Sequence, residues 1–101
     1  MDNYHMKNWP FSDPKNKAVI TTKKILSGRD YIRYVTHDID DGSWQFLNIQ
    51  SYELSENDAA VVGLDEITEL DPSIVELADL PLCWSASRDT EKSKWIRAQI
   101  A

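Results

Sequence analysis

The fold is decided by residues 34–46, which read YVTHDIDDGSWQF. Residues alternate in strand fashion on both sides of the central turn, with Tyr34 and Thr36 sharing one face of the first half and Trp44 and Phe46 sharing one face of the second. Such alternation with a period of two is typical of a strand that buries one side. The intervening IDDG at 39–42 holds residues that favour turns, because glycine adopts positive φ and aspartate bonds nearby amides. The stretch therefore predicts a β-hairpin.

The same stretch could also be a metal site, because it holds one histidine and three aspartates. An EF-hand loop needs a glycine at its sixth position and a glutamate at its twelfth. Counted from Asp38, the fifth position is Gly42 and the twelfth is Ile49, so the register fails. A hydrolase-type site needs several histidines and carboxylates from different elements, and the only other histidine is His5. The hairpin tip is the favoured interpretation.

The pattern outside the hairpin predicts one small α+β domain, with a mostly antiparallel sheet of about four to five strands and short helices. Residues 1–16 are expected to be an irregular lead whose Trp9 and Phe11 pack on the domain, which spans residues 17–101. Before the hairpin we expect a strand at 18–21 and a helical turn at 23–27 that Thr22 caps.

After the hairpin, the sequence predicts a helical turn at 55–58, a buried strand at 59–64 and a helix at 65–70. A further helix begins at Asp71 and Pro72, a cap followed by a proline at the first helical position. A last strand is expected at 82–88, and residues 94–100 are either helical or extended.

No catalytic, cofactor-binding or metal-ligating residue is predicted anywhere in the chain. Cys83 lies between Leu82 and Trp84 in an expected buried strand, whereas a reactive thiol needs an electropositive, partly exposed setting. The pair Glu66 and Glu69 is expected on a solvated helix face. The single cysteine and the polar, aromatic start of the chain favour a reducing cytoplasm as the location, and no apolar run reaches the length of a membrane span.

Charge is distributed unevenly along the chain, whose net charge is −6. Residues 34–87 contain twelve acidic residues and no lysine or arginine, whereas residues 1–33 carry a net charge of +4 and residues 88–101 a net charge of +2. Binding to a nucleic acid backbone requires cations, so a nucleic acid partner is not expected. An acidic surface can instead steer association with a basic protein.

Several motifs resemble one small bacterial family, first catalogued as a domain of unknown function and later grouped with predicted immunity proteins of polymorphic toxin systems. The similarity covers roughly residues 9–97, and its most specific strings are HDIDDGSWQF and LADLP followed by Trp84. A glycine often precedes this tryptophan in the family, where the present chain has Cys83, a difference that concerns packing more than function. Other similar segments are AVITTKKIL at 18–26 and IRYVTHD at 32–38.

The resemblance implies a cytoplasmic, non-enzymatic domain, some of whose relatives bind and neutralise a toxin. The leading hypothesis is a protein-binding domain that neutralises a basic bacterial toxin. The alternatives are a regulatory or housekeeping domain without a toxin partner and, less favoured, a small metal-dependent hydrolase. The predicted partner-binding residues are the acids of the hairpin tip and of the following helical region: Asp38, Asp40, Asp41, Asp65, Glu66, Glu69 and Asp71.

Overall fold

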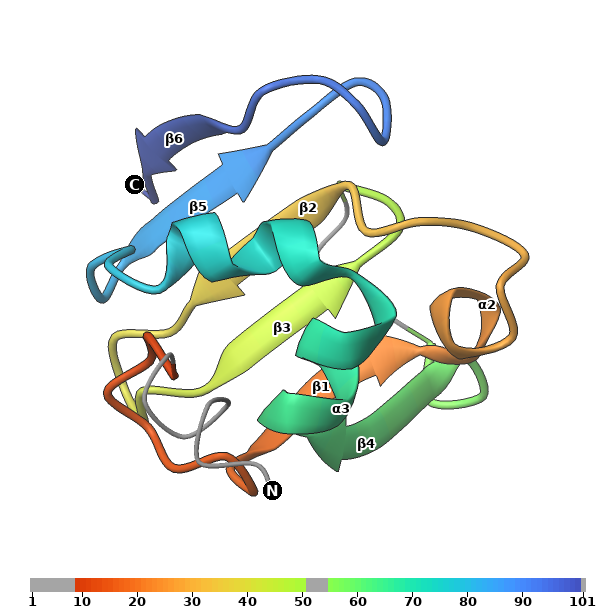
Figure 1. Ribbon diagram of the computed structural model, residues 1–101, viewed down its shortest axis with the longest axis horizontal. Helices are drawn as coiled ribbons and strands as arrows, with labels where there is room; N and C mark the ends of the chain where they lie inside the picture. The colour runs from red at the N-terminus through yellow and green to blue at the C-terminus, as the bar shows by residue number, and fades with distance from the viewer. Residues whose placement is uncertain (1–8, 51–54, 101) are drawn as a thin grey trace.

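A six-stranded mixed sheet forms the centre of the protein, as the computed structural model shows for residues 9–50 and 55–100 (Figure 1). The strands are β1 (Ala18–Thr22), β2 (Tyr34–His37), β3 (Trp44–Leu47), β4 (Ala59–Gly63), β5 (Trp84–Ser87) and β6 (Ile96–Gln99). The helices are α2 (Lys23–Leu26), α3 (Leu64–Leu70) and the 3-10 helix η1 (Pro72–Leu77). The α+β class is as the sequence predicted.

The strand order is β4-β1-β3-β2-β5-β6, and it corrects the expected sheet of four to five strands. The additional strand is β6, which forms from the tail at 94–100 and pairs antiparallel with β5. One pairing, between β1 and β3, is parallel. In this pairing the β2–β3 hairpin places β3 next to β1. Strand β3 also carries the buried side chains of Trp44 and Phe46.

The predicted hairpin is confirmed at the centre of this sheet. Strands β2 and β3 pair antiparallel, with Val35 opposite Phe46 and His37 opposite Trp44. The two aromatic side chains of β3 point into the core, as the alternation predicted, and both are about 1% exposed or less. The imidazole of His37 stacks on the Trp44 indole with ring centroids 3.8 Å apart.

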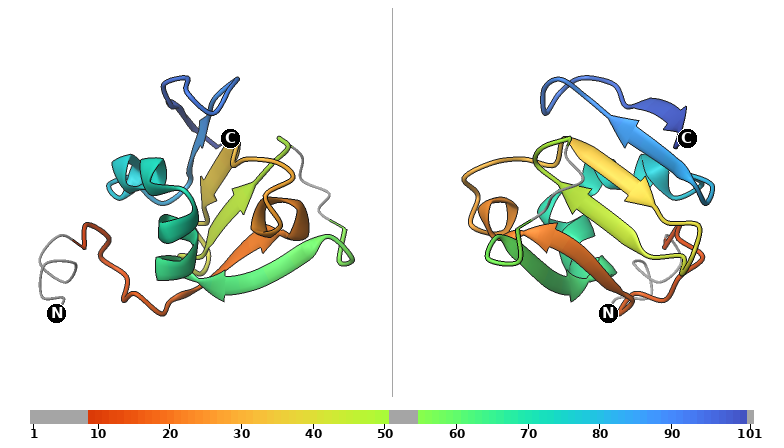
Figure 2. Two further views of the ribbon diagram at one scale, coloured as in Figure 1. Left: turned by 45° about the vertical axis from the view of Figure 1, so that its right-hand side comes forward. Right: turned by 180° about the vertical axis from the view of Figure 1, so that it is seen from behind.

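Helices α3 and η1 cover one face of the sheet, and the opposite face of the strands is free of them in the view from behind (Figure 2). The covered face contributes Val35, Phe46 and Ala86 to the core, and the helices contribute residues such as Ile67 and Ile74. Each of these five side chains is fully buried, so burial of apolar area holds the two layers together.

Residues 9–16 of the expected lead pack against the sheet through Trp9 and Phe11, as predicted, whereas residues 1–8 lie outside the described residues. Phe11 belongs to the core and lies edge-on to Trp44, with ring centroids 5.5 Å apart, and Trp9 packs beside it. The Trp44 indole nitrogen donates to a carboxylate oxygen of Asp13 at 2.9 Å. This bond satisfies the one polar atom of a buried tryptophan and fixes the lead next to the hairpin.

Strand β4 is an edge strand, which corrects the prediction of a buried strand at 59–64. It pairs only with β1, and Val61 is 69% exposed. An uninterrupted apolar run cannot be assigned to the centre or the edge of a sheet from its letters alone, because both use β-branched residues.

Local capping sets the ends of the helices where the sequence placed them. The Thr22 hydroxyl accepts a hydrogen bond from the amide of Ile25, and the Asp71 carboxylate accepts one from the amide of Ser73. Side-chain oxygens at these positions satisfy amides that the first helical turn leaves without partners. Residues after Pro72 form a 3-10 helix instead of the expected α-helix.

Arg88 is a buried arginine that joins four segments at the end of β5. Its guanidinium donates to the carbonyl of Ile32 at 2.9 Å, to the Ser73 hydroxyl at 2.9 Å and to the carbonyl of Glu91 at 3.1 Å. It also forms an ion pair with Asp71 at 2.7 Å, and its side chain is 1% exposed. Such a burial is tolerated because four of the five N–H donors are bonded to protein acceptors and the charge is paired with Asp71.

Replacement of Arg88 with methionine is expected to lower the free energy of unfolding by about 3–5 kcal/mol, because it leaves the Asp71 carboxylate without its cation. Urea unfolding monitored by circular dichroism measures the change. The double variant with Asp71→Leu serves as the control, and we expect its loss to be smaller than the sum of the two single losses. A loss below about 1 kcal/mol for Arg88→Met would contradict this role.

Cys83 is not inside a strand, which corrects the sequence prediction. It is half-buried, lies in the turn before β5 and has a φ of 71°. Its amide donates to the His37 carbonyl at 2.7 Å and its carbonyl accepts from Ile100 at 2.8 Å. Positive φ is unfavourable for residues with a Cβ, so a glycine, which the similar family often has here, would adopt this backbone without strain.

We expect Cys83→Gly to be at least as stable as the parent chain and Cys83→Val to lose about 1–2 kcal/mol, because a β-branched side chain is the least tolerant of positive φ. Chemical unfolding of the two variants under reducing conditions measures the difference. Equal losses in both would mean that the side chain, and not the backbone conformation, decides stability at this position.

Candidate partner-binding surface

The tip of the β2–β3 hairpin is ordered by its own aspartates. A carboxylate oxygen of Asp38 accepts from the Asp40 amide at 2.7 Å, and one of Asp41 accepts from the Ser43 amide at 3.0 Å. Gly42, with a φ of 70°, completes the turn and donates to the Asp38 carbonyl. The turn therefore presents its carboxylates from a fixed backbone, as short Asx turns do.

The pKa of Asp41 is lowered by its hydrogen bonds with Ser43. The hydrogen bond from the Ser43 backbone, followed by one from the Ser43 side chain, holds the pKa of Asp41 below its usual value. Hydrogen bonds donated to the charged form always act in this direction. Lys17, a cation of the lead segment, adds a smaller effect of the same sign.

Apolar side chains accompany the carboxylates at this tip. Ile39 sits inside the turn sequence and is 59% exposed, and Leu82 is 47% exposed. The bond from the Cys83 amide to the His37 carbonyl brings the turn that contains Leu82 alongside the end of β2. Protein interfaces typically combine a desolvated apolar centre with a polar rim, and this end of the sheet offers both.

Two further predicted residues, Asp65 and Glu66, lie at the same end of the sheet as the hairpin tip. Strand β4 ends at Gly63 opposite Ala18, the first residue of β1, and β1 runs parallel to β3. The start of α3 is therefore next to the start of β1 and on the same edge as the hairpin turn. The acids are not contiguous with the tip, because the start of α3 packs against the segment that holds Lys15 and Lys17: the amides of Asp65 and Leu64 donate to the carbonyls of these two lysines, each at 2.9 Å.

Both acids also stabilise the start of α3. The Glu66 carboxylate accepts from the Gly63 amide at 2.8 Å, and the Asp65 carboxylate accepts from the Glu66 amide at 2.9 Å. Negative charge at a helix N-terminus is favourable. These contacts leave the carboxylates at the surface, since Glu66 is exposed and Asp65 is half-buried.

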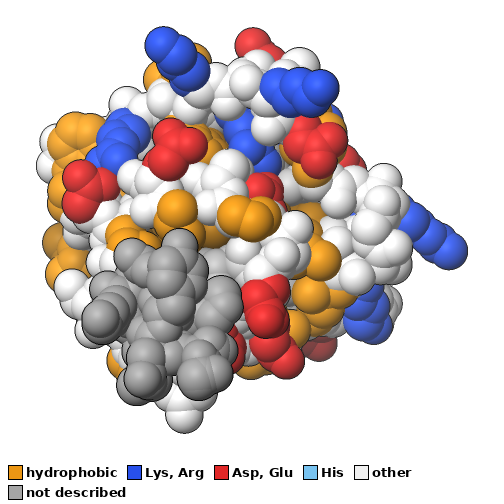
Figure 3. Space-filling model, viewed as in Figure 1, with side chains coloured by type: hydrophobic (Ala, Val, Ile, Leu, Met, Phe, Trp, Pro, Cys, Tyr) orange, Lys and Arg blue, Asp and Glu red, His pale blue; other side chains and the backbone are white. Residues whose placement is uncertain are grey.

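The last two predicted residues are placed differently. Glu69 is exposed on α3, and acidic side chains gather over this helix below the centre of the view, while acidic and basic side chains are mixed in its upper part (Figure 3). Asp71 is turned inward: its carboxylate bonds Ser73 and Arg88, and its side chain is 20% exposed. The structure gives Asp71 a role in the fold, so we leave it out of the surface proposed below.

The residues weighed as metal ligands do not converge. Nδ1 of His37 donates to the carbonyl of Leu80 at 2.7 Å, so this nitrogen carries a proton. Within residues 9–50 and 55–100, no group of three or more histidine, cysteine, aspartate or glutamate side chains is arranged to hold a metal ion. His5 lies outside the described residues.

We define the tip surface as Ile39, Leu82, Asp38, Asp40 and Asp41. The three acids were predicted from their turn chemistry, but the two apolar residues were missed. Ile39 is a single apolar letter inside a polar turn, and the position of Leu82 depends on the pairing of β5 with β2, which joins segments far apart in the sequence. No local pattern encodes that pairing.

Comparisons with protein-family models, with curated proteins and with solved structures found no match to this chain. The resemblance to the immunity-type family therefore stays a prediction made from its motifs. None of the helices in the described part of the chain has the length and apolar character that crossing a bilayer requires.

Replacement of Ser43 with alanine is expected to raise the pKa of Asp41 toward its usual value, because the side-chain hydrogen bond is lost while the backbone bond stays. A group with a lowered folded-state pKa contributes stability above its unfolded pKa and loses that contribution as the pH falls through its folded pKa. The contribution of Asp41 should therefore disappear at a less acidic pH in Ser43→Ala. A carboxyl-carbon NMR titration measures the pKa, and an unchanged value would contradict this assignment.

Proposed function

We propose that the chain is a non-enzymatic protein-binding domain that neutralises a basic protein, such as a bacterial toxin, in the cytoplasm. The observation that supports this proposal most directly is the tip surface, where two exposed apolar side chains stand among three carboxylates on a rigid turn. The family resemblance of the HDIDDGSWQF motif, which forms this same hairpin, supports it independently.

The chemistry of the tip surface suits a cationic partner. Carboxylates that border an apolar centre steer a basic protein during diffusion and raise its association rate by roughly 10- to 1000-fold at low salt. Apolar side chains that become fully desolvated then slow dissociation. Ile39 would insert into the partner, and the surrounding acids would pair with lysine or arginine at the rim.

A pre-formed turn also reduces the cost of binding. Side chains and loops that order only on association weaken affinity by roughly 0.5–1.5 kcal/mol for each immobilised side chain. The backbone of the tip is already fixed by the two Asx bonds, by Gly42 and by the bond from the Asp38 amide to the Ser43 carbonyl at 2.8 Å. Asp65, Glu66 and Glu69 form a second acidic group on α3, separate from the tip surface.

The most direct experiment uses the product of a toxin-like reading frame encoded beside this chain, and Asp40→Lys is the variant of choice. The Asp40 side chain makes no bond to the described residues, so the substitution reverses a charge without removing a cap. We expect Asp40→Lys to slow association with the basic partner by about tenfold or more at low salt. Stopped-flow or surface-based kinetics at two salt concentrations measures the rate.

The matched control is Glu56→Lys, which makes the same charge change at the opposite end of the sheet. Glu56 is exposed in the turn before β4. Its effect on the association rate should stay within about twofold. Equal slowing by both variants would show that only net charge matters, and it would remove the tip surface from the interface.

Ile39→Ser tests the apolar part of the surface separately. We expect it to leave the association rate nearly unchanged and to speed dissociation by about tenfold, which corresponds to roughly 1.4 kcal/mol. Failure of the parent chain to protect cells from the neighbouring product, or to co-purify with it, would argue against neutralisation and for a binding domain with another partner.

A further inference from the structure

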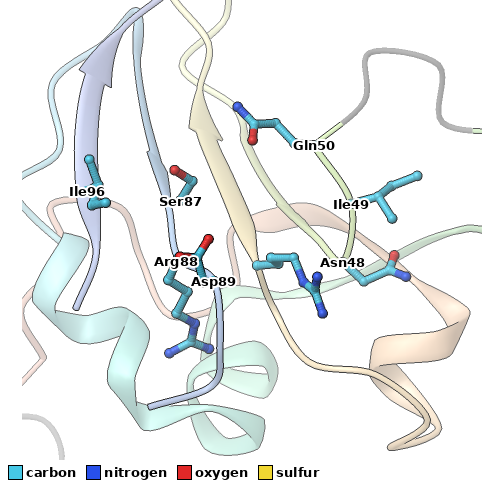
Figure 4. A pocket seen from close by; sticks show the side chains of 8 residues that line it. Asn48, Ile49, Gln50, Ser87, Arg88, Asp89 and Ile96 are labelled. Atoms are coloured by element: carbon cyan, nitrogen blue, oxygen red, sulfur yellow. The ribbon is translucent and has the colours of Figure 1, made fainter. Parts of the chain in front are cut away.

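A hollow lies at the end of the sheet opposite the tip surface, where β3 and β5 end and β2 and β6 begin. Its volume is about 340 Å³, which is within the usual range for small-molecule sites. Figure 4 shows Ser87 between Ile96 of β6 on one side and Ile49, in the segment after β3, on the other. The residues that line it are Arg33, Asn48, Ile49, Gln50, Ser87, Arg88, Asp89 and Ile96.

Two arginines line the hollow, and Arg33 has more donors without a protein partner than Arg88 has. The guanidinium of Arg88 uses its donors on protein acceptors, including Asp71. Nε of Arg33 is withdrawn from solvent and has no hydrogen-bond partner. A guanidinium that is neither fully hydrated nor fully bonded gains more from a nearby anion than a solvated one does.

Arg33 is also held in place before any ligand arrives. One terminal nitrogen donates to the Tyr31 hydroxyl at 2.7 Å, and this hydroxyl donates to the carbonyl of Asp89 at 2.9 Å. The guanidinium carbon lies 4.7 Å from the centre of the Tyr31 ring. Cation–π stacking and a fixed hydrogen bond together orient the fork of an arginine.

The charges around the hollow disfavour a doubly charged anion. Arg88 is neutralised by Asp71, Asp89 lines the hollow beside Arg33, and Asp30 also interacts electrostatically with Arg33. A phosphate with two negative charges would meet the Asp89 carboxylate without a second free cation to offset it. A carboxylate carries half of that charge, so Asp89 repels it less, and the Arg33 guanidinium can donate charge-assisted hydrogen bonds to it.

The walls add an apolar requirement. Ile49 is 51% exposed and Ile96 is 65% exposed, so both present apolar area that a ligand can cover. The side-chain hydroxyl of Ser87 and the side-chain amide of Gln50 make no hydrogen bond to the described residues and remain available to a ligand. We propose that this hollow binds a monocarboxylate attached to an apolar group, with Arg33 as the anion-binding residue and the two isoleucines as the apolar walls.

Titration of the ¹⁵N-labelled full chain with N-acetyl-leucine tests the proposal, with N-acetyl-leucine amide as the uncharged control. We expect saturable shifts of the amide resonances of Asn48, Ser87 and Ile96 with the acid, and at least about tenfold weaker binding of the amide. Inorganic phosphate should bind more weakly than the acid. Absence of saturable shifts, or equal binding of acid and amide, would overturn the proposal.

The variant Arg33→Gln should weaken binding of the acid by about tenfold or more, and Arg29→Gln, which makes the same charge change at an exposed position outside the hollow, should keep it within about twofold. Should Arg33→Gln disturb the fold, Ile96→Glu gives a second test, because it places a carboxylate at the exposed rim. We expect about tenfold weaker binding there as well, and an unchanged affinity would overturn the proposal.

The same titration can identify the source of the carboxylate. A tripeptide that ends in leucine presents the group at a chain terminus, whereas hexanoate presents it as a free acid. Tighter binding of the tripeptide would assign the hollow to a chain terminus, and tighter binding of hexanoate would assign it to a small acid; either result supports a monocarboxylate site.

Discussion

The ion pair between Arg88 and Asp71 is the interaction on which the rest of the architecture depends. The Arg88 guanidinium bonds the segment before β2, the start of η1 and the segment before β6. One side chain therefore connects both halves of the sheet to the helical layer. It also lies 4.1 Å from the centre of the Trp95 ring. A buried charge of this kind is unfavourable unless all of its partners are in place, which makes the four segments depend on one another.

Local chemistry made much of the fold predictable from the sequence. The hairpin, the Thr22 and Asp71 caps and the core positions of Trp44 and Phe46 follow from turn residues, capping oxygens and alternation, all of which act within a few residues. The strand count, the parallel β1–β3 pair and the edge position of β4 did not follow, because they depend on which distant strands pair. The positive φ of Cys83 could not be predicted either, because cysteine has no preference for this backbone conformation.

The candidate site was predicted in part for the same reason. The tip aspartates are turn formers and were found as such, and Asp65 and Glu66 were found as acids. Asp71 was grouped with them by charge, although its partner Arg88 is distant in sequence and could not be identified from the letters alone. Apolar Ile39 and Leu82 become part of a surface only after β5 pairs with β2. The polar residues of the tip surface could therefore be predicted from the sequence, whereas its apolar residues could be identified only from the tertiary structure.

The central position of the hairpin has a consequence for how the sheet can assemble. Closing a loop costs conformational entropy that grows with the length of chain between the paired residues. The pairs β2–β3 and β5–β6 join neighbours in sequence, whereas β1–β4 and β2–β5 join distant segments. The β2–β3 pair, which lies in the middle of the sheet, is thus among the pairs with the smallest entropic cost. In the finished sheet the free edge of β3 pairs with β1, and the free edge of β2 pairs with β5. If the sheet grows outward from this hairpin, each later strand pairs with a strand that is already ordered. The entropic cost of closing a long loop then arises after nucleation and does not add to the cost of forming the nucleus.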